Sequence, residues 1–206
     1  MLRIAILILL LIGLPANKPA YQPIFESCSA QVAAENYIHP APTTLPTDEE
    51  AEKITWSPDY NLSWADFEAA PDSAHTYIAA LTSSAVAYSH FCHEGELQVK
   101  VKAVFRKKES WVRPEAKTPH YLRHEKLHFD ITELHARKVR QMLHNRCFTC
   151  SQTDDLNAAI DTILQTWRKT DKQYDYQTHF SHRPSFQQAW EQKVDSLLLQ
   201  HNAYSY

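Results

Sequence analysis

A change in the spacing of apolar residues constrains the fold of this chain more than any other feature. In ELQVKVKAVF, residues 96–105, apolar side chains recur at every second position from Leu97 to Phe105. The positions between them are Gln or Lys as far as Lys102. This period of two is typical of a half-buried antiparallel strand. After residue 118 the apolar side chains follow helical spacing instead. Strands followed by helices predict an α+β domain.

Three helices are predicted in the second half of the chain. Thr118 followed by Pro119 forms a favourable N-cap and first-turn pair, and the helix that it opens is expected to run to about His144. A second helix is expected to begin near Asp154 or Asp155, and a third near Pro184. We therefore expect an N-terminal antiparallel sheet packed on the first helix, followed by two C-terminal helices.

The first 20 residues, MLRIAILILLLIGLPANKPA, have the composition of a signal peptide. Arg3 precedes an apolar run from Ile4 to Ile12, which continues past Gly13 and is ended by Pro15. That run is too short to span a bilayer comfortably, and an uncleaved membrane anchor is the alternative. We expect a secreted or periplasmic protein with no stable membrane association once the leader is removed.

Residues 21–52 are rich in Pro, Ala and Thr and then become acidic, which predicts a linker. The remaining residues, 53–206, are enough for one domain of ordinary size with its own hydrophobic core.

Composition excludes several classes of function. The formal net charge is -3 with acidic and basic residues interleaved, so a nucleic-acid partner is not expected. The chain has only 2 glycines, Gly13 and Gly95, and therefore lacks the glycine-rich loops that bind phosphates and dinucleotides.

The chain contains 4 cysteines, which an oxidising compartment would pair. Four cysteines allow three connectivities. One of them joins Cys147 to Cys150 within CFTC and Cys28 to Cys92. A redox CxxC site is the alternative interpretation, although no thioredoxin-like pattern surrounds it.

The motif HEKLH, within the first predicted helix, is the strongest signal for chemistry. On a helix His124 and His128 lie one turn apart on the same face, so both imidazoles can reach one ion. Glu125 is rotated by about 100° from His124, which lets it flank the ion without binding it. The motif predicts two zinc ligands and a general base. Two solvated histidines on a helix surface are the alternative interpretation.

A third ligand has to come from another segment, because histidines at successive turns of a straight helix cannot converge on one tetrahedral ion. QYDYQTHFSH, residues 173–182, is expected to form the loop before the last helix and offers Asp175, His179 and His182. Each of these residues is also explained as one that caps a helix or faces solvent.

Two groups of residues next to these motifs have structural interpretations. Glu133 and Arg137 are spaced to pair along the helix, and a buried pair would fix that helix against the sheet. Three tryptophans are most simply core aromatics: Trp64, Trp111 and Trp190.

Several segments together resemble a bacterial family, the domain of unknown function 922, described as predicted secreted zinc-dependent proteases. They are LSWADF (62–67), SW (110–111), LRHEKLHFDITELHARKVR (122–140), and YDYQT with a downstream QQAW (174–190). The resemblance covers about residues 53 to 200 and implies a zincin-like metallopeptidase acting on a peptide or protein substrate.

The same resemblance implies the site residues: zinc as cofactor, His124 and His128 as ligands, and Glu125 as general base. The family pattern continues after YDxxT with one residue and then His, a position that holds Phe180 here. We therefore take the neighbouring His179 as the third zinc ligand, with Asp175 or His182 as alternatives.

Two other functions fit these residues. One is an exported metal-binding or interaction protein without proteolytic activity, which the missing histidine favours. The other is a zinc hydrolase that acts on non-peptide amides. An open fourth coordination position would favour catalysis, whereas a closed site of four protein ligands would favour a structural role.

Overall fold

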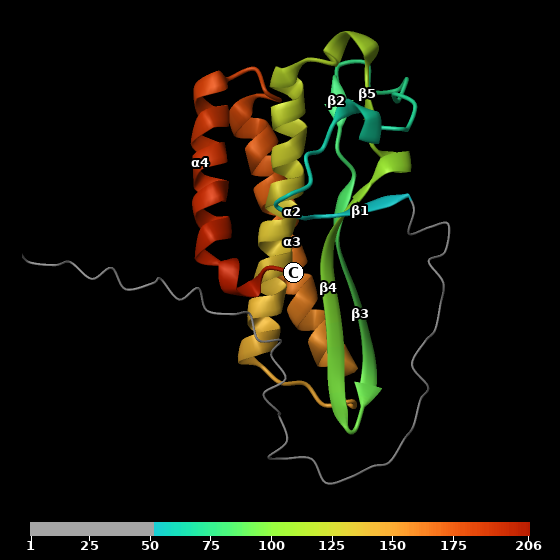
Figure 1. Cartoon of the computed structure of the whole chain (residues 1–206), viewed down its shortest axis with the longest axis vertical. Helices are drawn as coiled ribbons and strands as arrows, with labels where there is room; N and C mark the ends of the chain where they lie inside the picture. Colours follow the sequence, from blue (N-terminus) through green and yellow to red (C-terminus); the bar gives the residue numbers. More distant parts are fainter. Residues whose placement is uncertain (1–51) are drawn as a thin grey trace, which may run out of the picture.

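The structure, a computed structural model, describes residues 52–206, and they form an α+β fold with a small antiparallel sheet and three helices (Figure 1). The predicted signal peptide, residues 1–20, and all but the last residue of the predicted linker, residues 21–52, lie outside the described residues. Among the helices that are described, none has the length and apolar character needed to cross a membrane.

The main sheet is built on a long hairpin of β3 (Ser84–His93) and β4 (Glu96–Arg106). Glu94 and Gly95 between them both have positive φ, as a tight two-residue hairpin turn requires. The predicted alternation along β4 is confirmed, since Val101, Ala103 and Phe105 are all buried. β1 (Lys53–Thr55) pairs with the other edge of β4, which gives the strand order β1-β4-β3.

A second, two-stranded sheet consists of β2 (Ala80–Leu81) and β5 (Trp111–Val112), paired antiparallel. Short 3₁₀ turns connect and end the larger elements: η1 (Trp64–Asp66), η2 (Lys107–Glu109), η3 (Pro114–Ala116) and η4 (Asn202–Tyr204).

The three predicted helices are α2 (Pro119–Asn145), α3 (Thr153–Thr178) and α4 (Pro184–Gln200). The predicted start of α2 is confirmed, because the hydroxyl of Thr118 accepts a hydrogen bond from the backbone N–H of Tyr121 at 3.3 Å. Pro119 and Pro184 stand in the first turns of α2 and α4, where a missing N–H has no cost.

Helix α2 is the centre of the domain and contacts the hairpin, α3 and α4, with α4 on the side away from the hairpin (Figure 1). Toward the sheet, the Phe129 ring lies 5.7 Å from that of Phe105, measured between centroids. Toward α3 and α4 the core contains Leu127, Ile131, Tyr174, Trp190 and Val194. Trp111 and Trp190 are buried, and Trp64 is partly buried against the core, as expected of core aromatics.

A buried ion network holds α2 in place. Glu133 accepts hydrogen bonds from Arg137 Nε at 2.9 Å and from Arg140 Nη1 at 3.0 Å, so the predicted Glu133–Arg137 pair forms and is buried. The two guanidinium groups also donate to carbonyl oxygens of three other elements: Leu198 of α4 at 2.6 Å, Tyr204 of η4 at 2.7 Å and Val101 of β4 at 3.2 Å.

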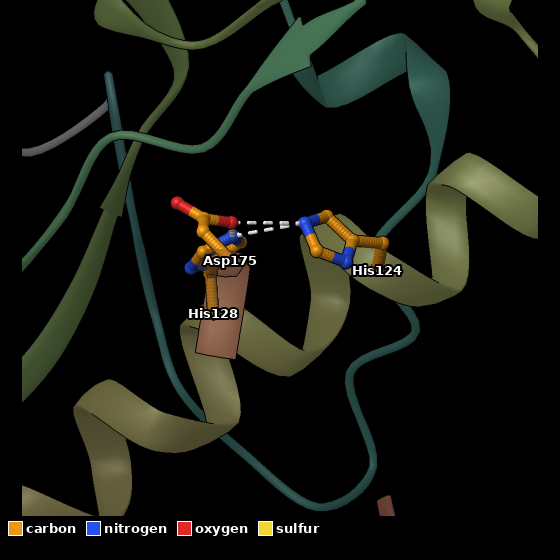
Figure 2. A group of neighbouring side chains, drawn as sticks. All are labelled: His124, His128 and Asp175. Atoms are coloured by element: carbon orange, nitrogen blue, oxygen red, sulfur yellow. Dashed lines mark hydrogen bonds and ion pairs between the residues drawn. The ribbon is translucent and has the colours of Figure 1, made fainter. Parts of the chain in front are cut away.

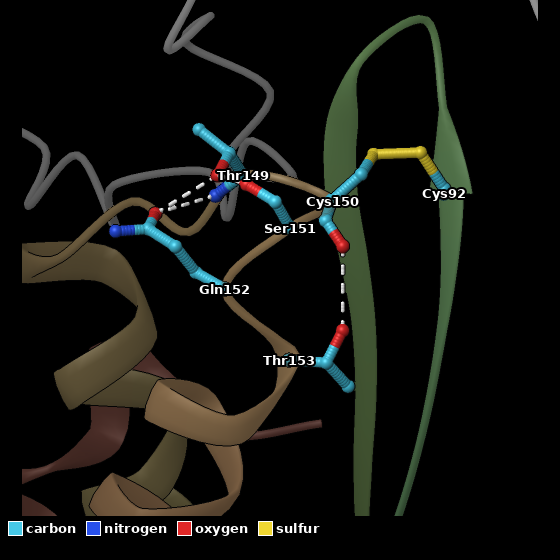
Figure 3. The surroundings of a disulfide bond; sticks show 6 residues. All are labelled: Cys92, Thr149, Cys150, Ser151, Gln152 and Thr153. Carbon is cyan, nitrogen blue, oxygen red and sulfur yellow. Dashed lines mark hydrogen bonds between the residues drawn. A yellow bond between two sulfur atoms is a disulfide. The ribbon is translucent and has the colours of Figure 1, made fainter.

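A disulfide joins Cys92 of β3 to Cys150 in the α2–α3 loop, with the Cα atoms 5.5 Å apart (Figure 3). Of the three connectivities that the sequence left open, the one that joins Cys147 to Cys150 and Cys28 to Cys92 is therefore excluded. The loop lies beside the hairpin, where the N–H of Leu97 donates to Phe148 O at 3.3 Å, and this contact brings Cys150 to Cys92. Cys147 is also disulfide-bonded. Because Cys150 is bonded to Cys92, CFTC is not a local redox pair. Cys28 lies outside the described residues.

Candidate metal centre

His124 and His128, one turn apart on α2, are both buried and turn their imidazoles toward the same point. Their Nε2 atoms are 3.3 Å apart, and the ring planes are close to perpendicular at 86°. The helical spacing thus brings two nitrogen donors together, as the sequence predicted.

Asp175, on the last turns of α3, supplies a third donor to the same point (Figure 2). Its Oδ1 lies 3.1 Å from His124 Nε2 and 3.0 Å from His128 Nε2. These three side chains form the metal cluster, the one group among the described residues with three donor atoms close enough to share an ion. The cluster joins α2 to α3 near the beginning of the first helix and the end of the second.

The geometry of the metal cluster fits zinc. Donors around a tetrahedral zinc with bonds of about 2.0 Å are separated by about 3.3 Å, and the three donor atoms here are 3.0–3.3 Å apart. Two imidazole nitrogens whose lone pairs face each other and a carboxylate repel unless a cation or a proton lies among them. Two imidazoles with one carboxylate are a ligand set that catalytic zinc sites use.

The other ring nitrogen of each histidine has an acceptor of its own. His128 Nδ1 is 2.6 Å from Asp171 Oδ1, and His124 Nδ1 is 3.1 Å from Gln187 Oε1. Such acceptors hold the proton on Nδ1, which leaves the Nε2 lone pair directed at the ion. Both histidines are therefore fixed in the tautomer that binds a metal.

A chain of hydrogen bonds fixes Gln187 in turn. Its Oε1 accepts from Tyr174 Oη at 2.7 Å, and its Nε2 donates to Glu191 at 3.0 Å. Glu191 is paired with Arg123 at 3.1 Å. The Tyr174 ring also stacks on the imidazole of His124, with centroids 4.5 Å apart. Helix α4 thus orients a ligand that lies on α2.

The electrostatics of the metal cluster favour a positive charge. Burial opposes protonation of His128, but the carboxylates of Asp171 and Asp175 outweigh it and raise its pKa well above the usual value. Burial also raises the pKa of Asp175, but the imidazoles of His124 and His128, which lie 3.1 Å and 3.0 Å from its carboxylate, outweigh it and hold that pKa well below its usual range. Asp175 therefore stays ionised, as a metal ligand must be.

Glu125 borders a cavity of about 380 Å³ that the metal cluster also lines. The side chain is 4 % exposed, and no protein group among the described residues hydrogen-bonds its carboxylate. The backbone is held, since Thr82 Oγ1 donates to the carbonyl of Glu125 at 3.1 Å. A buried carboxylate without a protein partner is free to bind a group that enters the cavity.

The structure brings Asp175, rather than His179, to the two α2 histidines. His179 and His182 line the cavity but are not part of the metal cluster. The predicted loop begins later than expected: Asp175 is still in α3, and His179 is its C-cap in the left-handed conformation, with φ 50°.

Two residues that orient the ligands were missed from the sequence, Asp171 and Gln187. Asp171 and Asp175 are spaced i,i+4, as His124 and His128 are, and this matching spacing on two helices is the signal that would have found Asp171. Gln187 is the first residue of QQAW, one of the segments that resemble the family, and that segment is the signal that could have pointed to it.

The family model of a bacterial protein of unknown function, DUF922, matches residues 46–183. The matched range includes the metal cluster, Glu125 and the loop as far as His182, and it ends before α4. No curated protein and no solved structure matches the chain.

Proposed function

Because the chain belongs to the bacterial family DUF922, whose function is unknown, we propose from the site that it is an exported zinc-dependent metallopeptidase with a zincin-like arrangement. The observation behind this proposal is the pairing of a three-donor metal cluster with an unpartnered carboxylate in one cavity. His124, His128 and Asp175 would hold the zinc. A bound zinc ion polarises a carbonyl group and lowers the pKa of water.

The number of protein ligands favours catalysis over a structural role. Structural zinc sites use four protein ligands, whereas catalytic sites use three and keep one position open. The metal cluster has three residues among those that the structure describes, and it lines a cavity. This supports an enzyme over the alternative of a non-catalytic metal-binding protein.

Glu125 is the residue best placed to move a proton. It follows His124 directly in α2, lines the same cavity and has no protein partner for its carboxylate in the described part of the chain. A carboxylate in this position takes a proton from water during attack and delivers it to the leaving amine.

The β2 region of the cavity wall favours a peptide substrate over other amides. Residues 77–82, which include β2, contribute to this wall. β2 is paired with β5 on one edge, and on its other edge no strand of the described region is paired with it. An open strand edge binds an extended peptide through backbone hydrogen bonds, which a non-peptide amide cannot provide.

The test begins with the chain without residues 1–20, in which zinc per chain and cleavage of a quenched fluorescent peptide mixture are measured. We expect one zinc and measurable cleavage. Glu125→Gln should retain the zinc and lose the cleavage, whereas Glu115→Gln, a matched change at an exposed glutamate outside the cavity, should change neither.

Unchanged cleavage by Glu125→Gln would contradict the assigned role of this residue. A folded protein that binds no zinc even when the metal is supplied would contradict the site, and the interaction protein would become the better hypothesis. Cleavage of cell-wall amides but not of peptides would instead favour the non-peptide hydrolase.

A further inference from the structure

The mouth of the cavity is apolar and exposed. Three large side chains that line it remain open to solvent: Tyr77 is 78 %, Phe180 is 55 % and Leu81 is 37 % exposed. They come from two separate segments that line the same cavity as the metal cluster, the β2 region and the loop after α3. Exposed apolar side chains gathered around one cavity indicate a binding surface.

The charge of the cavity limits what it can bind. Among the residues that line it there is no lysine or arginine, whereas Glu125, Asp171 and Asp175 are all acidic. The negative charge of these carboxylates would largely compensate the positive charge of one bound dication held by the two histidines of the metal cluster. The cavity is also lined by His179 and His182 but by no permanently charged cationic side chain, so an acidic side chain of a ligand would be repelled by the three carboxylates.

The loop that presents Phe180 has an unusual backbone. His179, Phe180 and Ser181 have φ of 50°, 52° and 75°, three consecutive non-glycine residues in the left-handed region. This region is sterically unfavourable, and it is rare for a residue as bulky as phenylalanine. Backbone strain of this kind persists only where surrounding contacts enforce it, and it concentrates at functional sites.

The contacts that enforce this loop conformation are present. Ser181 is fully buried, and its Oγ lies 2.6 Å from His120 Nε2 on α2. The N–H of Phe180 donates to Asp175 O at 2.9 Å, and the N–H of Arg183 donates to Thr178 O at the same distance. Anchors on both sides thus hold an exposed aromatic ring at the cavity mouth, directly after the turn of α3 that supplies Asp175.

We propose that the cavity selects extended peptides with a large apolar side chain near the cleaved bond, disfavours acidic side chains there, and uses Phe180 as a specificity-determining residue. This inference rests on the proposed peptidase function. Because the strained backbone exposes the ring of Phe180, this ring does not contribute to the hydrophobic core. Contact with a ligand is the role that the position of Phe180 supports.

The test is a peptide series that differs at one position next to the cleaved bond: Phe, Leu, Ala or Glu. We expect kcat/KM to be highest for Phe and Leu and lowest for Glu. In Phe180→Ala, kcat/KM for the Phe and Leu peptides should fall about 10- to 100-fold, the range for losing one large apolar contact, and by less than about 3-fold for the Ala peptide. Phe180→Leu should restore most of the preference.

Tyr176→Ala is the matched control, because Tyr176 is an aromatic residue on α3 that is 80 % exposed and does not line the cavity. It should leave the whole series unchanged. Zinc content and unfolding midpoint, measured for each variant, separate loss of contact from loss of fold. An equal effect of Phe180→Ala on all four peptides, or a preference for Glu, would overturn the inference.

Binding of the same peptides to zinc-loaded Glu125→Gln, followed by fluorescence anisotropy, separates this inference from the proposed function. If no peptide is cleaved but the apolar peptides bind preferentially, in a way that depends on Phe180, then the proposed function fails and the binding preference holds. If peptides are cleaved and bound without preference for apolar side chains, the peptidase holds and the inference is wrong.

Discussion

Replacing Glu133 by Gln tests how strongly the buried ion network fixes the helix that bears HEKLH. Glu133 is 1 % exposed, and its carboxylate accepts hydrogen bonds from Arg137 and Arg140, whose side chains are 5 % and 12 % exposed. Gln preserves the size of the side chain and one acceptor oxygen but removes the negative charge that the two guanidinium groups share. Since solvent reaches none of these groups well, the lost charge is not compensated by water.

The expected cost follows from this burial. Breaking a buried ion pair by removing one partner costs about 3–5 kcal/mol, because the remaining charge is left without compensation. The upper half of that range applies here because two cations lose their partner. For a domain with a total stability of about 5–15 kcal/mol, the substitution removes about a quarter or more of it.

The assay is urea unfolding followed by tryptophan fluorescence. With an m-value of about 2 kcal/mol/M, the midpoint of Glu133→Gln should fall by about 2 M. Glu109→Gln makes the same chemical change in an exposed pair, where Glu109 is 55 % and Arg106 is 40 % exposed, and it should cost less than about 1 kcal/mol. If the two substitutions cost the same, burial of the network does not stabilise the fold and our reasoning is refuted.

Three further predictions concern the metal cluster and the core. Asp175→Ala should abolish stoichiometric zinc binding, measured by elemental analysis after dialysis, while His179→Ala retains it; the reverse result would restore His179 as the third ligand. Asp171→Asn should weaken zinc binding about 10- to 100-fold in competition with a chromogenic chelator, because His128 loses the charged acceptor that orients it. Burial lowers the pKa of His135 to about 4, so stability should be complete above pH 6.5 and fall by up to about 3 kcal/mol as the pH falls toward 4. The urea midpoint of His135→Gln should lack this part of the pH dependence, and an identical pH dependence in both proteins would contradict it.

Local signals in the sequence were sufficient to predict α2, the helix that bears two of the three ligands. The Thr118–Pro119 pair specifies where α2 begins, because the cap involves residues only three apart. Once the helix is fixed, the positions of His124 and His128 on one face follow from its period. The alternation along β4 likewise identified the face that packs on α2, since side chains of a strand alternate regardless of distant contacts.

The third ligand could not be found in this way, because it depends on where α3 ends and how α3 packs along α2. One additional turn of helix keeps Asp175 directed at α2, whereas His179 becomes the left-handed cap beyond it. The connectivity of the disulfide stayed open for a similar reason. Cys92 and Cys150 meet because a loop packs beside the hairpin, a contact between residues 58 apart in the sequence.

The disulfide and the metal cluster lie at opposite ends of the α2–α3 pair, with Cys150 in the connecting loop and the metal ligands near the far ends of both helices. Loss of the proposed ion would remove the link between α2 and α3 only at the end of the pair that lies far from the disulfide. Local opening would then be confined to the last turns of α3 and the loop that follows, while the covalent bond keeps the connecting loop on the hairpin. Under the proposed function, a chain built in this way would lose its ion and take it up again without having to refold.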